Sequence, residues 1–569
     1  MEKMDSILLE VIWSRLISIV DEMAITLKRM SFSTIVREAN DYACVLFDDK
    51  GNSLAQSSLS IPSFIGCLPR TIKLMLEIFP PDQLEEGDVL ITNDPWIGAG
   101  HLPDIVVVAP IYNKRRLIGF SGSIAHASDV GGRLWSADSN ELFEEGIRIP
   151  VMKLYRAGTP NQDLFDLLLS NVRVPEQVRG DISAQVSSNE MIAERLKEIL
   201  AEYQIETLEE ISFEITSRSE KAMRREIEQI PDGTYHHTVR ADGFESPIMI
   251  SCSLTVHGSD LLIDYTGTSP QSRRGINVVP NYTFSFTMYA VQCALLPRVP
   301  NNEGCFRPVK VSAPEGSILN PRFPAAVGAR HIIGHYLPYA VFGALAHVIP
   351  ERVIADCGTS GYPYFGGVNE GGLKFTQFLP TAGGFGARYD KDGENCLYFP
   401  SNVSNVPAEV VEALTPLQID KKEFIMDSGG PGKFRGGCGQ EFNIRMKDGV
   451  KVPPLTMSMI TERNIYPAEG VAGGRAGSVR KTFLNDGDTP HPKMQILFPV
   501  GSYIRNFTPG GGGYGNPLDR DPRKVAQDVR YGLVSFQKAR EEYGVVLDSE
   551  SFEILKEETD KLRGLRTRD

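Results

Sequence analysis

The apolar residues among the first thirty positions recur three and four apart, the spacing that places side chains on one face of an α-helix. Asp5 or Ser6 can cap such a helix, because either side chain accepts a hydrogen bond from a free backbone N–H of the first turn. We therefore predict an N-terminal helix. Its apolar face would carry Ile7, Leu8, Val11, Ile12, Leu16, Ile19 and Val20.

Strand-like runs follow after residue 40. The stretch YACVLFDDKGNSLAQ sets the turn residues 48–52 between two apolar runs and predicts a β-hairpin. The runs DVLITND, DIVVVAPIY and RLIGFSGSIAHAS predict three more strands. From about Pro175 to Ile230 the pattern is charged and helical, and the turn residues 231–233 end it.

The second half of the chain is richer in β-type patterns and in glycine. Strand patterns resume near residue 232, and residues 321–350 return to helical spacing. Glycine clusters fill residues 355–515, and we interpret them as tight turns in a large β unit, with a ligand loop as the alternative for one or two. The predicted fold class is α+β, a large multi-domain chain with mixed sheets. Its predicted divisions are an α+β region over 1–231, a β-rich and Gly-rich region over 232–515, and a C-terminal segment of two polar helices over 516–569.

Composition narrows the classes of function. The 569 residues are 41% hydrophobic, without an apolar run of the roughly 18 residues that a membrane span requires. The N-terminus lacks the pattern of a signal peptide, so we expect a soluble protein of the cytoplasm. The net charge is -13 and no block of lysine and arginine occurs, which argues against nucleic acid as a partner. The eight cysteines form no C-x-x-C pair, so we predict neither a zinc ribbon nor a disulfide framework.

Two H-x-x-D segments carry the candidate chemistry. His101 and Asp104 lie before one predicted strand, and His126 and Asp129 lie at the end of the next. Paired strands can bring these ends to one rim, with Asp41, which precedes a further strand, as an additional candidate. Imidazole and carboxylate ligands suit zinc, manganese or iron, and three protein ligands leave one position open. Each segment alone is a short pattern, for which a solvated histidine near a turn is the usual interpretation.

A divalent ion at such a site would favour hydrolysis, since it lowers the pKa of a bound water from about 15.7 to about 7. A carboxylate that is not a tight ligand, Asp129 or Asp41, could act as the general base or orient a histidine. The sequence does not fix which carboxylate has which role.

Other motifs are weaker. In HIIGHY, His331 and His335 are four apart but lack the glutamate of H-E-x-x-H, so a helix-surface or packing pair is favoured. The phosphate-binding motif G-x-x-x-x-G-K-[ST] and the nucleophile motif G-x-S-x-G do not occur. The G-x-G-x-x-G within GGGGYG does not lie between a strand and a helix. No segment therefore indicates a nucleotide site.

The sequence resembles the hydantoinase B and oxoprolinase family. NDPWIGAGHLPDIVVVAPIY is similar to its motif N-D-P-[YW]-x-G-[GA]-[TG]-H-L-P-D, and SGSIAHASDVGG to its A-H-x-x-D-[VI]-G-G. REANDYACVLFDDKGNSLAQ, SGGPGKFRGGCGQ and TPGGGGYGNPLDRDP match further landmarks in the family's order, so the likeness spans nearly the whole chain.

The resemblance implies a two-part enzyme. A partner A-type ATPase subunit would bind ATP and phosphorylate the substrate, and this B-type subunit would carry a metal ion, zinc first and manganese second. By motif, His101, Asp104 and His126 fall on the family's metal ligands, with Asp41 as a fourth. We expect hydrolysis of a small cyclic amide (a lactam, hydantoin or 5-oxoproline) in a hetero-oligomer with two copies of each subunit. The alternatives are a subunit of an ATP-dependent ketone carboxylase of the acetone or acetophenone type, or a non-catalytic scaffold.

Overall fold

The largest sheet contains seven strands from the first 160 residues. The computed structural model describes residues 5–485, 487 and 489–566. The strands lie in the order β2-β1-β5-β4-β3-β6-β7, and every neighbouring pair is antiparallel. The predicted hairpin is present as β1 and β2, and the three predicted strands as β3, β4 and β5. The bounds are β1 Tyr42–Asp48, β2 Ser53–Gln56, β3 Val89–Thr92, β4 Asp104–Asn113, β5 Arg116–His126, β6 Met152–Arg156 and β7 Thr159–Pro160.

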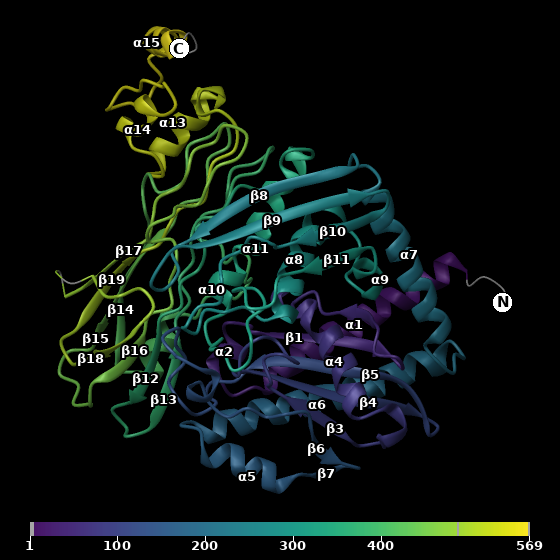
Figure 1. Ribbon diagram of the computed structural model, residues 1–569. Helices are drawn as coiled ribbons and strands as arrows, with labels where there is room; N and C mark the ends of the chain where they lie inside the picture. The colour runs from purple at the N-terminus through teal and green to yellow at the C-terminus, as the bar shows by residue number, and fades with distance from the viewer. Residues whose placement is uncertain (1–4, 486, 488, 567–569) are drawn as a thin grey trace.

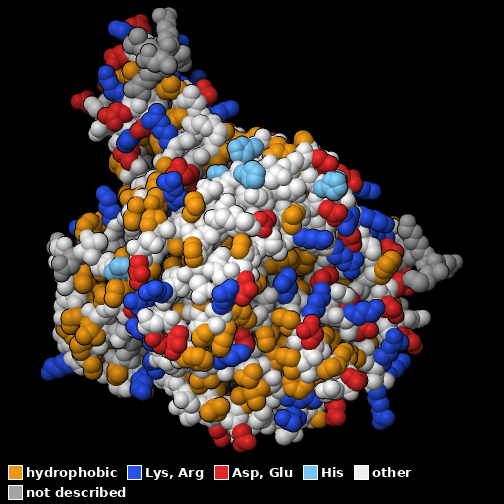
Figure 2. Space-filling view, viewed as in Figure 1, with side chains coloured by type: hydrophobic (Ala, Val, Ile, Leu, Met, Phe, Trp, Pro, Cys, Tyr) orange, Lys and Arg blue, Asp and Glu red, His pale blue; other side chains and the backbone are white. Residues whose placement is uncertain are grey.

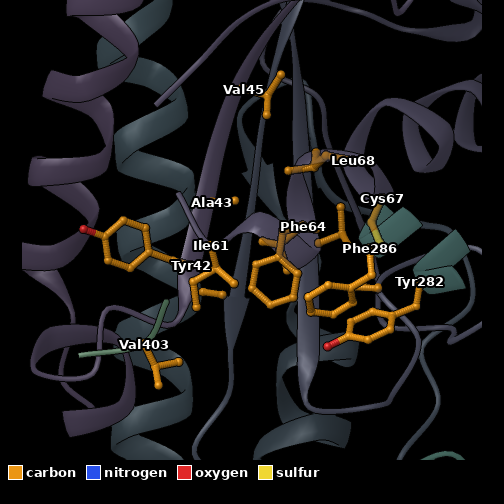
Figure 3. Close-up of a cluster of buried hydrophobic side chains, with 14 of the residues drawn as sticks. Tyr42, Ala43, Val45, Ile61, Phe64, Cys67, Leu68, Tyr282, Phe286 and Val403 are labelled. Atoms are coloured by element: carbon orange, nitrogen blue, oxygen red, sulfur yellow. The ribbon is translucent and has the colours of Figure 1, made fainter. Parts of the chain in front are cut away.

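Helices cover both faces of this sheet, which is why its central strands are apolar without alternation. Helices α1 (Ser6–Met30) and α6 (Pro175–Glu202) pack on each other and on the strands. On the other face lie α3 (Pro62–Ile65) and α4 (Cys67–Ile78). Figure 3 shows Phe64 and Leu68 on the opposite side of the strands from Tyr42.

The predicted N-terminal helix is confirmed as α1, but part of its predicted face was wrong. Ile7, Leu8 and Val11 are exposed. The buried stripe is Leu9, Ile12, Trp13, Leu16, Ile19, Val20, Met23, Ala24 and Leu27. The stripe therefore includes Leu9 and Trp13 at the start of the helix and continues to its last turn. The helix packs against α6.

A second sheet has the order β11-β10-β9-β8 and is covered on one face by helices. Strands β8 and β9 bury alternate residues, because α11 (Leu337–Leu345) packs on one side of them and is itself packed against α8 (Pro280–Leu295). Helix α8 was not predicted, whereas the β pattern predicted from residue 232 is present as these strands. The strands are β8 Gly233–Ala241, β9 Ile248–His257, β10 Asp260–Asp264 and β11 Val309–Ser312.

Two more four-stranded sheets form the left side of the molecule in Figure 1, with the orders β13-β12-β16-β18 and β14-β15-β19-β17. Their bounds are β12 Tyr364–Val368, β13 Lys374–Phe378, β14 Leu417–Phe424, β15 Gln440–Met446, β16 Leu455–Ser458, β17 Lys481–Leu484, β18 Gln495–Phe498 and β19 Tyr503–Phe507.

The remaining helices of the first 500 residues are α2 Thr34–Arg37, α5 Gln162–Ser170, α7 Glu209–Ile227, α9 Glu303–Phe306, α10 His331–Gly334 and α12 Ala408–Leu414. These elements confirm the α+β, multi-domain class.

Many glycines of 355–515 permit close packing of extended chain segments, which corrects their interpretation as tight turns. A Cβ atom on Gly384 or Gly510 would lie 1.8 Å from a backbone oxygen of a neighbouring segment, and neither residue has a left-handed φ. The segments are joined by backbone hydrogen bonds, such as Gly437 N–H to Phe385 O (2.8 Å) and Gly430 N–H to Gly511 O (2.8 Å). Figure 1 shows them as unlabelled ribbons running side by side toward α13 and α14.

The C-terminal segment has a small core of its own. The main hydrophobic core extends from Leu9 to Ile504, whereas a second core holds Val525, Val529, Val534, Ala539, Tyr543 and Val545. Three helices occur where two were predicted: α13 Pro522–Arg530, α14 Phe536–Glu541 and α15 Lys556–Arg566. The divisions at residues 231 and 515 stay predictions. Among the described residues, no helix has the length and apolarity to cross a membrane.

Candidate metal centre

Three neighbouring strand ends bring the predicted ligands together. Asp104 is the first residue of β4 and His126 the last of β5, and the two are direct partners in the antiparallel register. Asp41 directly precedes β1 on the other side of β5, and its carbonyl accepts a hydrogen bond from His126 N–H (3.1 Å). Because adjacent antiparallel strands begin and end at the same edge, the order β1-β5-β4 places all three side chains at one rim.

The loop between β3 and β4 positions His101. The Asn93 side chain holds this loop, donating to Leu102 O (2.8 Å) and accepting from Ile149 N–H (2.6 Å). Gly100 has φ +96°, and a Cβ there would lie 2.9 Å from Cδ of Arg330. Position 100, directly before His101, therefore needs glycine for two reasons: its left-handed backbone conformation and its close approach to the Arg330 side chain.

The ligand atoms of His101, Asp104 and His126 all lie within 4.8 Å of one another, and all three side chains are buried. Asp104 Oδ1 lies 2.9 Å from His101 Nε2 and 3.1 Å from His126 Nδ1. Asp41 Oδ2 lies 3.8 Å from His126 Nδ1. Ligands about 2.0–2.2 Å from one zinc ion are about 3.0–3.6 Å apart in octahedral or tetrahedral geometry, so these separations are close to those of a common coordination sphere.

The protonation of His101 gives a direct test of whether a cation fits. Its Nδ1 lies 2.8 Å from Gly328 O, and because a carbonyl only accepts, Nδ1 carries the proton. Burial, reinforced by the Arg330 guanidinium, lowers the pKa of His101 to about 4, so Nε2 has a lone pair at neutral pH. That lone pair faces Asp104 Oδ1 without a hydrogen bond. The two groups repel each other unless a cation lies between them, so the donor set fits a divalent ion.

Charges around the cluster favour an ionised Asp104. Burial alone would raise its pKa, but the Arg330 guanidinium opposes burial, and the pKa lies well below the usual range. Arg330 donates to Asp104 Oδ2 and to Ala99 O, and its guanidinium lies 4.1 Å from the Tyr282 ring centroid. Burial raises the pKa of Asp41 to about 6, although the charge of His126 opposes this.

A second layer of contacts orients His101. Gly328 O, which accepts from His101, also accepts from Trp135 Nε1 (2.7 Å). Glu145 Oε1 in turn accepts from the N–H groups of Val327 (2.9 Å) and Gly328 (2.8 Å). Burial raises the pKa of Glu145 to about 8. Outer contacts of this type fix the tautomer and direction of a metal-binding histidine.

The cluster opens on a cavity of about 340 Å³. Polar residues of the cluster and its neighbours form about half of its walls, and apolar or aromatic residues form the rest. Figure 3 shows four of the latter, Ile61, Phe64, Tyr282 and Val403. His331 and His335 also line it and are buried, with ring centroids 5.7 Å apart, so of the two predicted interpretations the packing pair is confirmed and the helix surface is wrong. Burial lowers the pKa of His335 to about 3.

The structure does not bring Asp129 into the cluster. Its Oδ1 accepts from Arg173 Nη1 (2.6 Å) and its Oδ2 from the Arg173 backbone N–H, and it lines an adjacent cavity of about 410 Å³ beside His126. Sequence reasoning missed Arg330, Trp135 and Glu145. Trp135 lies nine positions after His126 in the same motif-bearing loop, which is the one local signal that could have indicated it.

Comparisons with known proteins show the family to which the chain belongs. A family model described as hydantoinase B/oxoprolinase matches residues 5–517. The chain is 34% identical to the B-type subunit of a putative D-/L-hydantoinase from Pseudomonas sp. (strain NS671), over 99% of this chain and 98% of that protein. The crystal structure of the ATP-dependent caprolactamase from Pseudomonas jessenii has a TM-score of 0.91 at 29% identity, covering 99% of this chain and 100% of the other. Nucleotide-free acetone carboxylase has a TM-score of 0.88 at 22% identity, covering 100% and 83%, a likeness of fold alone.

Proposed function

Because the chain belongs to the hydantoinase B/oxoprolinase family, we propose that it is the metal-bearing subunit of an ATP-dependent enzyme that hydrolyses small cyclic amides. The observation that carries the proposal is the buried cluster of His101, Asp104 and His126, in which a histidine lone pair and a carboxylate oxygen face each other at 2.9 Å. The names of relatives, which describe subunits, support a partner, and we propose an A-type ATPase chain, with two copies of each chain.

His101, Asp104 and His126 would hold the ion, with Asp41 as the fourth ligand, and zinc is our first choice and manganese our second. A divalent ion there would supply Lewis acidity that lowers the pKa of a coordinated water to about 7. Arg330 keeps Asp104 ionised, and Gly328 O keeps the His101 proton on Nδ1. These contacts hold the ligand set in its binding form at neutral pH.

Asp41 is also our candidate for the group that receives a proton from the attacking water. Its carboxylate lies at the same rim as the other three side chains, with Oδ2 3.8 Å from His126 Nδ1, where it could accept that proton if it is not tightly bound to the ion. Asp129 has both oxygens occupied by Arg173, so we propose that it positions the loop after His126. The aromatic and apolar part of the cavity wall suits the hydrocarbon part of a small ring, and the polar part suits its amide.

The decisive experiment combines metal analysis with reconstituted turnover. We expect the purified chain to contain about one divalent ion, and His101→Ala and His126→Ala to lose both the ion and ATP-dependent hydrolysis of hydantoin, ε-caprolactam or 5-oxoproline in the presence of the A-type subunit. His237→Ala, at a half-buried histidine of β8, is the control and should retain both. Full metal occupancy in either ligand variant would contradict the site. Bicarbonate-dependent ATP turnover with a ketone, and none with cyclic amides, would contradict hydrolysis.

A further inference from the structure

His331 has no role in the ligand cluster, yet it lies in the wall of the same cavity. It is 5% exposed, and neither of its ring nitrogens has a hydrogen-bond partner among the described residues. Nearly all buried polar groups are hydrogen-bonded, and a histidine that only packed in a core would pair at least one nitrogen. Both ring nitrogens are therefore available to hydrogen-bond a molecule bound in the cavity.

Aromatic rings hold His331 close to the cluster. The Trp135 ring centroid lies 5.1 Å from that of His331, 4.8 Å from that of His126 and 5.8 Å from that of His101. One indole thus contacts both metal-site histidines and His331. On another side, the Tyr362 ring lies edge-on to His331 at 4.7 Å. These rings fix the orientation of the imidazole before any ligand enters.

The chemistry of His331 complements an amide. Burial, with the neighbouring His335 and Arg330, keeps the pKa of His331 well below its usual range, so the ring is neutral. A neutral imidazole presents one N–H donor and one lone-pair acceptor. The reacting amide of a cyclic substrate presents one carbonyl acceptor and one N–H donor, and in a buried cavity each of these needs a partner.

We propose that His331 is a substrate-binding residue, which hydrogen-bonds the reacting amide across the cavity from His101, Asp104 and His126. The inference rests on the proposed function, since it assigns the amide-binding partner at that centre. It assigns no proton transfer to His331.

The test is His331→Phe in the reconstituted complex. Phenylalanine keeps a ring of similar size against Trp135 and Tyr362 but removes both nitrogens. We expect unchanged metal content and melting temperature, a KM for the hydrolysed cyclic amide raised roughly 10-fold or more, and a matching loss of affinity for that amide by calorimetry without ATP. His331→Asn, which restores a donor and an acceptor, should recover part of the affinity.

His237→Phe is the matched control, because it makes the same exchange outside the cavity and should leave KM unchanged. If wild-type complex hydrolyses the amide and His331→Phe has the same KM and affinity, the role of His331 is contradicted while the proposed function stands. The same conclusion follows if His331→Phe acts only by losing metal. If the wild-type complex hydrolyses no cyclic amide, the proposed function fails and this inference fails with it.

Discussion

At the scale of single residues, we predict that Asp41 makes metal binding at the proposed site sensitive to pH. Its pKa of about 6 means that protons compete with a cation below that pH, whereas His101, with a pKa of about 4, stays neutral over most of this range. We predict that metal affinity falls by about 10-fold per pH unit below pH 6 and levels off above it. Chelator competition between about pH 5 and about pH 7.5 measures this slope.

Asp41→Asn is the control for that slope. The amide keeps the shape of the side chain but has no proton to release, so affinity should be lower at neutral pH and nearly flat between about pH 5 and about pH 6. An unchanged slope in Asp41→Asn would assign the titration to another group.

Glu145 positions the cluster without touching it. Removing its Oε1 leaves the N–H groups of Val327 and Gly328 without their acceptor and loosens the carbonyl that orients His101. We predict that Glu145→Ala weakens metal binding by about 10- to 100-fold and lowers the free energy of unfolding by about 1–3 kcal/mol. Glu145→Gln keeps an acceptor oxygen and should retain most of both. Equal losses in the two variants would contradict the role of the Oε1 acceptor.

Site residues could be predicted from the sequence where they lie next to predicted strands. This is the case for His101, Asp104, His126 and Asp41, because antiparallel pairing of those strands places their ends together. Arg330 is 226 residues from Asp104 in sequence, and Glu145 is 183 residues from Gly328, so no local pattern links these pairs. The choice between a surface and a packing position for His331 stayed open because its one-turn helix α10 is too short to show a buried face.

At the scale of elements, the glycine-rich segments depend on the absence of side chains. A Cβ on Gly384 would lie 1.8 Å from Gly437 O, and one on Gly510 would lie 1.8 Å from Ser428 O. No flexible side chain can yield there, so Gly384→Ala and Gly510→Ala should each cost at least about 3 kcal/mol of stability or prevent soluble expression. Gly371→Ala, whose nearest neighbour would be a side-chain atom at 3.4 Å, should melt within a few degrees of wild type. Wild-type melting of Gly384→Ala would contradict this packing.

Helix α8 and the glycine segments show where the sequence pattern becomes ambiguous. Eleven of the sixteen residues of α8 are buried, so it lacks the polar face that reveals a helix, and its aromatic and threonine residues favour a strand by propensity. Glycine suits a turn and a close chain contact equally well, and only the neighbouring segment decides between them. The β1–β2 hairpin could be predicted because turn residues mark it. Helices α6 and α7 could be predicted because each has a charged face.

At the scale of the whole molecule, Arg520 joins the C-terminal helices to the glycine-rich region. It is 1% exposed and pairs with Asp392 (2.6 Å) and with Asp528 of α13 (2.8 Å). Removing the cation leaves two carboxylates without their shared partner, which we expect to cost about 3–5 kcal/mol. Arg520→Leu should therefore expose residues 521–566 to limited proteolysis while the metal centre keeps its ion. Arg523→Leu, at an exposed position of α13, is the control. A protease-resistant Arg520→Leu chain would contradict the link.

The last prediction concerns the A-type ATPase subunit that we propose as the partner of this chain. The chain has no G-x-x-x-x-G-K-[ST] motif, and Figure 2 shows acidic and basic side chains interspersed on the visible face, without a basic field that would attract a nucleotide. We predict that the purified chain alone shows no ATP turnover with any cyclic amide, and that adding the A-type subunit produces it. Turnover should saturate at one partner per chain, with a light-scattering mass of two copies of each. ATP-dependent hydrolysis by the chain alone would contradict the two-part enzyme, because the nucleotide would then bind within these residues.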